Sequence, residues 1–124
     1  MQYAILCYQA EAPVCALSKA QDQSLMDELK QTHRALEPKV RFGPIARLMP
    51  TTAATTVRSG RETLVLDGPF AETKEQLLGF YVLEADSLDA AIDAARALAG
   101  PREAAGLYGA LEIRPIQYLE MPRA

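Results

Sequence analysis

The chain has 124 residues, of which 49% are hydrophobic, and its 13 basic and 16 acidic side chains give a net charge of −3. This length supports one compact domain whose core needs neither metal nor disulfides. The charges form no run of five like signs, which argues against a nucleic-acid-binding surface. We therefore expect a single domain over residues 1–120 and a loose tail at 121–124.

The cysteines and the N-terminus predict a cytoplasmic protein. Two cysteines, Cys7 and Cys15, are too few for the disulfide framework of a small secreted domain. The N-terminus lacks the basic segment of a signal peptide, and no apolar stretch is long enough to span a bilayer. We therefore expect no contact with a membrane.

The first part of the chain predicts a strand, a helix and an extended segment. Residues 2–8 are short and apolar, as in a strand that is covered on both faces. Ser18 and Gln21 have the spacing of a capping box, which predicts the start of a helix of about 18 residues. Residues 39–49 favour an extended segment, and Gly43-Pro44 within it is typical of an edge strand or a bulge.

The middle of the chain predicts a β-hairpin. Residues 55–58 and 62–66 are rich in β-branched and apolar side chains, and the segment between them contains a permissive glycine. Asp67-Gly68-Pro69-Phe70 predicts a tight reversal. Thr73 with Gln76 predicts one capped helical turn before the next strand.

The last part of the chain predicts a strand, a second helix and a final strand. Residues 79–85 are apolar, and Ser87 is a good N-cap for the helix that follows. Gly100-Pro101 predicts the end of that helix. Residues 107–118 then favour the last strand.

This order of elements predicts an α+β fold of the ferredoxin-like kind, with two helices on one face of an antiparallel sheet and an inserted hairpin. Residues 3–8 and 80–85 are apolar at both odd and even positions, although two helices cover only one face. The second face needs a cover, and we expect a second copy of the chain to supply it. In the alternative, the inserted hairpin folds over that face.

Several strings resemble the YCII-related family, and specifically its DGPF branch. The most specific is DGPFAETKE at residues 67–75, followed by GFY at 79–81, and Phe42-Gly43-Pro44 and residues 55–58 accompany it. The resemblance implies a homodimeric α+β barrel in which two ferredoxin-like sheets face each other. It also implies a regulatory context, because members of this branch are often encoded beside sigma factors.

The chain departs from the better-known enzyme-like members of this family. Those relatives carry a histidine in the first helix and an aspartate before a proline after the second helix, proposed as an acid–base pair. Met26 and Gly100 stand nearest to these two positions here, and His33 lies two turns beyond the first of them. The departure favours binding over turnover.

Asp67 and His33 are the candidate catalytic residues. Asp67 follows a strand at a sharp turn, from which a carboxylate can act as a general base or a ligand anchor. The alternative for Asp67 is ordinary turn chemistry. His33 is the one histidine of the chain, and its alternative is a packing role with one hydrogen bond. The candidate substrate-binding residues are Arg58, Phe70, Lys74 and Tyr81.

Other chemistries are excluded by their missing motifs. One histidine and two separated cysteines do not make a metal site, and no nucleotide-binding or serine-hydrolase motif is present. We therefore expect neither a metal nor a cofactor. Two hypotheses follow. In the first, the protein is a dimer that binds a small polar molecule in a cleft between its sheets, with Asp67 as an acid–base group. In the second, it is a non-catalytic accessory dimer that acts through protein contacts in a sigma-factor-linked circuit.

Overall fold

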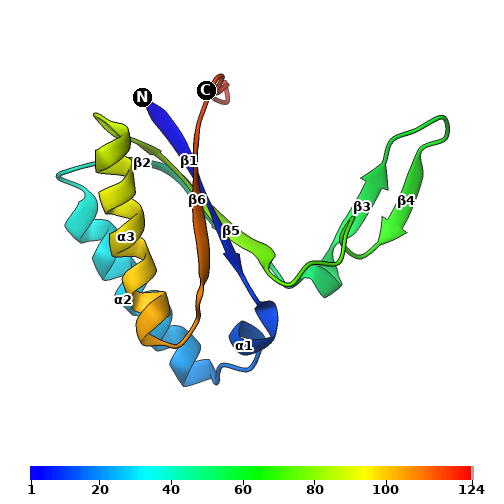
Figure 1. Cartoon of the computed structure of the whole chain (residues 1–124), viewed down its shortest axis with the longest axis horizontal. Coiled ribbons are helices and arrows are strands. Elements are labelled where there is room, and N and C mark those ends of the chain that lie inside the picture. Colours follow the sequence, from blue (N-terminus) through cyan, green and yellow to red (C-terminus); the bar gives the residue numbers. More distant parts are fainter. Residues whose placement is uncertain (124) are drawn as a thin grey trace.

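The computed structural model describes residues 1–123, and Figure 1 shows a sheet with two long helices on one side and a hairpin that projects from the other end. The elements in chain order are β1 (Gln2–Gln9), α1 (Glu11–Cys15), α2 (Lys19–Leu36), β2 (Arg41–Arg47), the 3₁₀ helix η1 (Thr51–Ala53), β3 (Thr55–Arg58), β4 (Leu64–Asp67), β5 (Gln76–Glu84), α3 (Leu88–Ala104) and β6 (Gly109–Pro115).

The main sheet confirms the ferredoxin-like prediction. Its four strands have the order β2-β5-β1-β6, and every neighbouring pair is antiparallel. Alternate residues of β1, including Ile5 and Cys7, are buried toward the helices, as the two-residue repeat of a strand requires. Leu83 on β5 and Leu98 on α3 complete the same core. Each such side chain contributes about 1.5–3 kcal/mol when it is fully buried.

The helix α2 forms as its sequence predicts. Ser18 accepts a hydrogen bond of 3.1 Å from the backbone N–H of Gln21, and the Gln21 side chain accepts one of 2.9 Å from the N–H of Ser18. This reciprocal pair satisfies two amides that the first turn leaves free. The apolar stripe Leu25, Leu29 and Leu36 is buried against the rest of the domain.

The predicted end of the second helix is wrong, because α3 continues through Gly100 and Pro101 to Ala104. A proline removes one backbone donor within a helix. Here the Arg102 guanidinium donates from Nη1 to the Leu98 carbonyl at 2.5 Å and so adds a bond across the proline turn. The chain leaves the helix at Gly106, whose φ of 75° favours glycine.

The predicted helical turn at Thr73 is also wrong. The Thr73 hydroxyl donates to the Glu75 carbonyl at 2.7 Å, and the Gln76 side chain donates to the Thr73 carbonyl at 2.5 Å. Both side chains therefore bond to carbonyls and cap no helix, and β5 begins directly at Gln76. The short elements α1 and η1 were not predicted; the Glu11 carboxylate of α1 accepts two hydrogen bonds from Thr51 and joins them.

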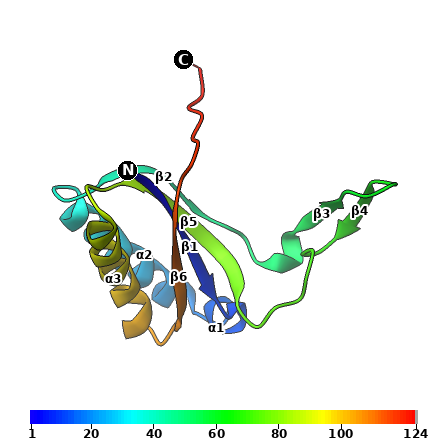
Figure 2. The same cartoon turned by 45° about the horizontal axis from the view of Figure 1, so that its top comes forward.

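The predicted hairpin forms from β3 and β4, and it leaves the second face of the sheet open. Figures 1 and 2 show the hairpin extending away from the body of the domain, with both long helices on the opposite side of the sheet. The alternative in which the hairpin covers this face is therefore not observed. Within residues 1–123, no helix is both long and apolar enough to cross a membrane.

Candidate functional site

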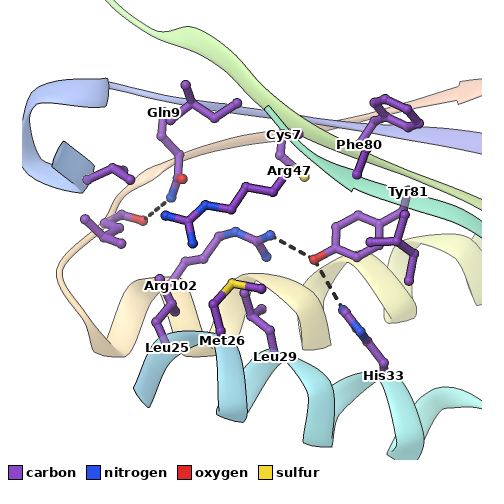
Figure 3. Close-up of a pocket in the computed structure, with 16 residues that line it drawn as sticks. Cys7, Gln9, Leu25, Met26, Leu29, His33, Arg47, Phe80, Tyr81 and Arg102 are labelled. Atoms are coloured by element: carbon purple, nitrogen blue, oxygen red, sulfur yellow. Dashed lines mark hydrogen bonds between the residues drawn. The ribbon is translucent and has the colours of Figure 1, made fainter. Parts of the chain in front are cut away.

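A cavity of about 190 Å³ lies between the helix-covered face of the sheet and the helices (Figure 3). The sheet supplies Cys7 and Gln9 of β1, residues 78–81 of β5 and the end of β2, whereas α2 and the C-terminal part of α3 supply the opposite wall. Most of its lining is apolar. The lining residues on which the site depends are Cys7, Gln9, Met26, His33, Arg47, Gly79, Tyr81 and Arg102.

The spacing of residues along each element explains why these side chains meet. Cys7 and Tyr81 occupy positions of β1 and β5 that point toward the helices, and both are buried. Met26 and His33 lie two turns apart on α2, so that both reach the same wall. Gly79 has no side chain to occupy the space, and a Cβ there would lie 2.7 Å from the Ala46 carbonyl oxygen of β2.

A chain of polar groups crosses the cavity. The Arg102 guanidinium donates from Nη2 to the Tyr81 hydroxyl at 2.8 Å, and the same hydroxyl lies 3.5 Å from His33 Nε2, as the dashed lines in Figure 3 show. The imidazole of His33 also packs edge-on against the Tyr81 ring, with centroids 5.4 Å apart. The arrangement fixes the tyrosine hydroxyl between a cation and a nitrogen base.

The surroundings keep His33 and Tyr81 neutral near pH 7. Burial, with a smaller contribution from the Arg102 charge, lowers the pKa of His33 from its ordinary 6.5. Burial raises the pKa of Tyr81 above its ordinary 10.0, although Arg102 acts against this shift. The Tyr81 hydroxyl therefore keeps its proton and accepts from Arg102, and it is placed to donate that proton toward His33 Nε2.

The cavity carries an excess of positive charge. Arg47 forms a two-point ion pair with Asp22 on α2, with N···O distances of 2.7 and 3.2 Å. The Asp22 carboxylate therefore compensates the charge of Arg47. In the described part of the chain, Arg102 has no carboxylate within the 4.0 Å of an ion pair, and none of the cavity's lining residues is acidic. The cavity thus offers one unpaired guanidinium to an anion.

The remaining polar lining does not add reactive chemistry. Burial raises the pKa of the Cys7 thiol, which opposes formation of a nucleophilic thiolate even though Arg102 lowers it in part. The Gln9 amide donates to the Leu107 carbonyl at 3.0 Å, which fixes its orientation. These two side chains shape the cavity and leave Arg102, Tyr81 and His33 as its functional groups.

The structure divides the residues proposed from sequence into two groups. His33 and Tyr81 lie together in the cavity, where His33 combines the predicted packing role with a hydrogen bond. The other four lie on the hairpin and the loop that follows it, and are exposed: Arg58, Asp67, Phe70 and Lys74.

Within that second group, Arg58 donates to the Phe70 carbonyl at 3.4 Å. Asp67 is the last residue of β4 and precedes Gly68, whose φ is 94°. Among residues 1–123, the Asp67 carboxylate makes no hydrogen bond that would explain it as turn chemistry. A role for these four residues at a site between two copies stays a prediction.

Two arginines of the cavity were not found from the sequence. Arg102 follows Gly100-Pro101, which predicted the end of the helix, so its place on the inner side of a longer helix was hidden. Arg47 ends the edge strand β2, where a charged residue is ordinary. Met26 did carry a signal, because it stands nearest to the histidine of the enzyme-like relatives, and it lines the cavity.

Comparison with known proteins gives a consistent family assignment. The model of the YCII-related domain matches residues 1–117. An uncharacterized protein of Rhizobium meliloti (strain 1021) is 50% identical over 117 residues, which cover 94% of this chain and 92% of that protein.

Proposed function

This chain belongs to the YCII-related family, and we propose that it binds a small organic acid in the cavity between its sheet and its helices. The observation that carries the proposal is the unpaired guanidinium of Arg102, which lines a mostly apolar cavity. A charged group is seldom held in apolar surroundings without a counter-charge. A carboxylate or a similar anion would supply the missing partner and accept two hydrogen bonds from the guanidinium.

The volume and lining of the cavity limit the ligand to a small molecule with an apolar body. A cavity of about 150 Å³ accommodates benzene, so that the 190 Å³ here fits one ring or a short aliphatic chain with a single acidic group. Leu25, Leu29 and Leu107 would contact the apolar part. The hydroxyl of Tyr81 would lie beside the acidic group, because Arg102 binds both.

Proton exchange is the reaction that this arrangement would support. At neutral pH the Tyr81 hydroxyl is protonated and His33 Nε2 is free to accept a proton, which are the states that a proton relay requires. We propose binding as the primary function, with His33 and Tyr81 as the groups to test for turnover. Asp67 as a further acid–base group stays a prediction.

Isothermal titration calorimetry with defined probes tests the proposal. Benzoate and hexanoate should bind, and the neutral benzyl alcohol should bind at least about tenfold more weakly, because a hydrogen bond to a charged group contributes about 1.5–3 kcal/mol. Arg102→Met keeps the apolar stem and removes the charge, and it should weaken binding of the acids by about 10- to 100-fold. Its effect on benzyl alcohol should be small.

Arg96→Met is the matched control. Arg96 lies on the same helix, its side chain is 79% exposed, and it is not among the residues that line the cavity. This variant should bind both acids as the wild type does. Equal affinities of the wild type and Arg102→Met for benzoate would contradict the proposal. It would also be contradicted if neither acid gave a binding signal at about 10 millimolar, which is on the order of the dissociation constant of a weakly bound small molecule.

We further propose that the protein is a homodimer of the DGPF type, joined through the open face of its sheet. Apolar side chains at alternate positions of β1 and β5 support this, since they are partly exposed and no helix covers them: Ala4, Leu6, Tyr8, Phe80 and Val82. The second candidate function, an accessory dimer that acts through protein contacts in a sigma-factor-linked circuit, stays a prediction.

A further inference from the structure

The segment between β2 and β5, residues 48–75, forms an arm that carries the β3–β4 hairpin. Figures 1 and 2 show this hairpin well away from the sheet and the helices. Its register pairs Val57 with Val65 and Thr56 with Leu66, so that apolar side chains lie on both of its faces. Val57 is 66% exposed and Val65 69% exposed. An isolated two-stranded hairpin is marginally stable in water, so this arm requires a surface to pack on.

The accessible surface of the chain is larger than that of a compact monomer of the same mass. It amounts to 8912 Å², whereas a compact monomer of 13.5 kDa exposes about 6,500 Å². The excess of about 2,400 Å² matches the share that one chain contributes to a large permanent dimer, roughly 1,000–2,500 Å². The arm contributes many of the large apolar side chains that are exposed in the described chain, among them Val57, Leu64, Val65, Leu66 and Phe70.

Both unpartnered surfaces belong to one chain, and they are continuous. The arm leaves the sheet after Arg47 of β2 and returns at Gln76 of β5, four residues before the partly exposed Phe80 on the open face. When two copies are related by a twofold axis, every contact between them occurs twice: the arm of the first copy meets the second copy, and the arm of the second copy meets the first in the same way. A second copy of the chain can therefore cover the open face and the arm at the same time.

We infer that the arm of each chain packs on the body of a second copy, so that the two chains interlock. The contact adds to the sheet-to-sheet contact proposed above, and it does not depend on ligand binding in the cavity. The contact also bears on the candidate site residues of the arm. Arg58, Asp67, Phe70 and Lys74 would be presented to the partner chain, and any site that uses them would form between copies.

Sedimentation equilibrium of full-length variants tests the contribution of the arm. The wild type should be a dimer, and Val65→Asp should weaken dimerisation by about tenfold or more, because it places a charge in the buried contact. Leu88→Asp is the matched control: Leu88 is a 51% exposed apolar residue at the first turn of α3, where an acidic side chain is tolerated. Far-UV circular dichroism should show both variants folded, since among residues 1–123 no residue of the hairpin belongs to either core cluster.

Intermolecular contacts identify the surface that the arm occupies. In a sample that mixes carbon-13-labelled and unlabelled chains, isotope-filtered nuclear Overhauser spectra should connect the methyl groups of Val57 and Val65 with protons of the other copy. Cross-peaks confined to the same chain would overturn the inference, as would a dimer without any cross-peak from the arm. A wild-type monomer at 10 micromolar, on the order of ordinary dimer affinities, or equal dimerisation of Val65→Asp and Leu88→Asp would also overturn it.

Discussion

The guanidinium of Arg102 is 2.8 Å from the hydroxyl oxygen of Tyr81, and its central carbon lies 5.7 Å from the centroid of the same ring. One residue comes from the end of the long helix α3 and the other from the middle of the central strand β5. The contact therefore joins the two layers of the fold at the cavity. It holds an uncompensated cation in place before any ligand binds, which reduces the cost of ordering that side chain on binding.

Tyr81→Phe should weaken both the fold and ligand binding. The change removes the acceptor of the Arg102 hydrogen bond and leaves the ring in place, so the free energy of unfolding should fall by about 1–2 kcal/mol. Benzoate affinity should fall several-fold, because the guanidinium loses its fixed orientation. Urea denaturation and calorimetry measure the two effects, and unchanged values in both would show that the hydroxyl positions nothing.

The stability of the protein should decrease when the pH falls through 6.5. The pKa of His33 is below its ordinary 6.5 in the folded chain, first because of burial and second because of Arg102. The unfolded chain therefore binds the proton more readily, so that this contribution to stability is fully present above pH 6.5 and is lost as the pH falls toward the folded-state pKa. Urea midpoints between pH 7.5 and 5.5, roughly the range in which histidine titrates, should show this loss.

His33→Gln should flatten that part of the pH profile. Glu11 and Asp22 also have lowered pKa values, but their ordinary values of 4.5 and 3.8 place their effects at lower pH. Because His33 is the one histidine, its proton resonance can be followed directly. A titration midpoint at or above 6.5 would contradict the assigned environment.

Asp67→Asn should leave the fold intact. The carboxylate is exposed at the end of β4, and the turn after it depends on Gly68, whose N–H donates to the Ala54 carbonyl at 2.7 Å. The free energy of unfolding should change by less than about 0.5 kcal/mol, as is usual for surface substitutions. If thermal denaturation instead shows a large loss of stability, Asp67 has a structural role in the turn.

Two glycine substitutions should have opposite effects. Gly79→Ala places a methyl group 2.7 Å from the Ala46 carbonyl oxygen, which should destabilise the protein by about 1–3 kcal/mol because the backbone must move. Gly100→Ala meets no atom within 4 Å inside α3 and should stabilise it by about 0.5–1 kcal/mol through helix propensity. Chemical denaturation of both variants measures the difference, and equal effects would show that β2 does not approach Gly79 closely.

The local sequence predicted those elements whose signals act within a few residues. The capping box at Ser18, the leucine stripe of α2 and the broken edge strand at Gly43-Pro44 all formed where expected. The prediction failed where a side chain made a hydrogen bond, two or four residues away, that the residue pattern does not indicate. Pro101 did not end α3, and the Arg102 side chain donates a hydrogen bond to the Leu98 carbonyl in the turn that contains this proline. The Thr73 side chain was expected to accept from a backbone amide, but it donates to the Glu75 carbonyl.

The candidate site was predicted only in part, because its residues come from different elements of the fold. His33 and Tyr81 were proposed separately, one from its chemistry and one as a strand tyrosine, and they meet because α2 packs against β5. Arg102 is recognisable as a functional residue only once α3 is known to extend past Pro101. Arg58, Asp67, Phe70 and Lys74 lie on the arm. The sequence of one chain does not determine where this arm lies in an assembly of two chains.

Chemical-shift mapping with benzoate tests the central claim most directly, because it locates the bound acid within the fold. In a titration of the nitrogen-15-labelled full-length protein, the largest shifts should occur at Gln9, Met26, Gly79 and Arg102, which surround the cavity, with a shift of the His33 side-chain resonance. Saturable shifts at these positions are the predicted result. Shifts that gather on residues 55–70, or no saturable shift around Arg102, would contradict a site between the sheet and the helices.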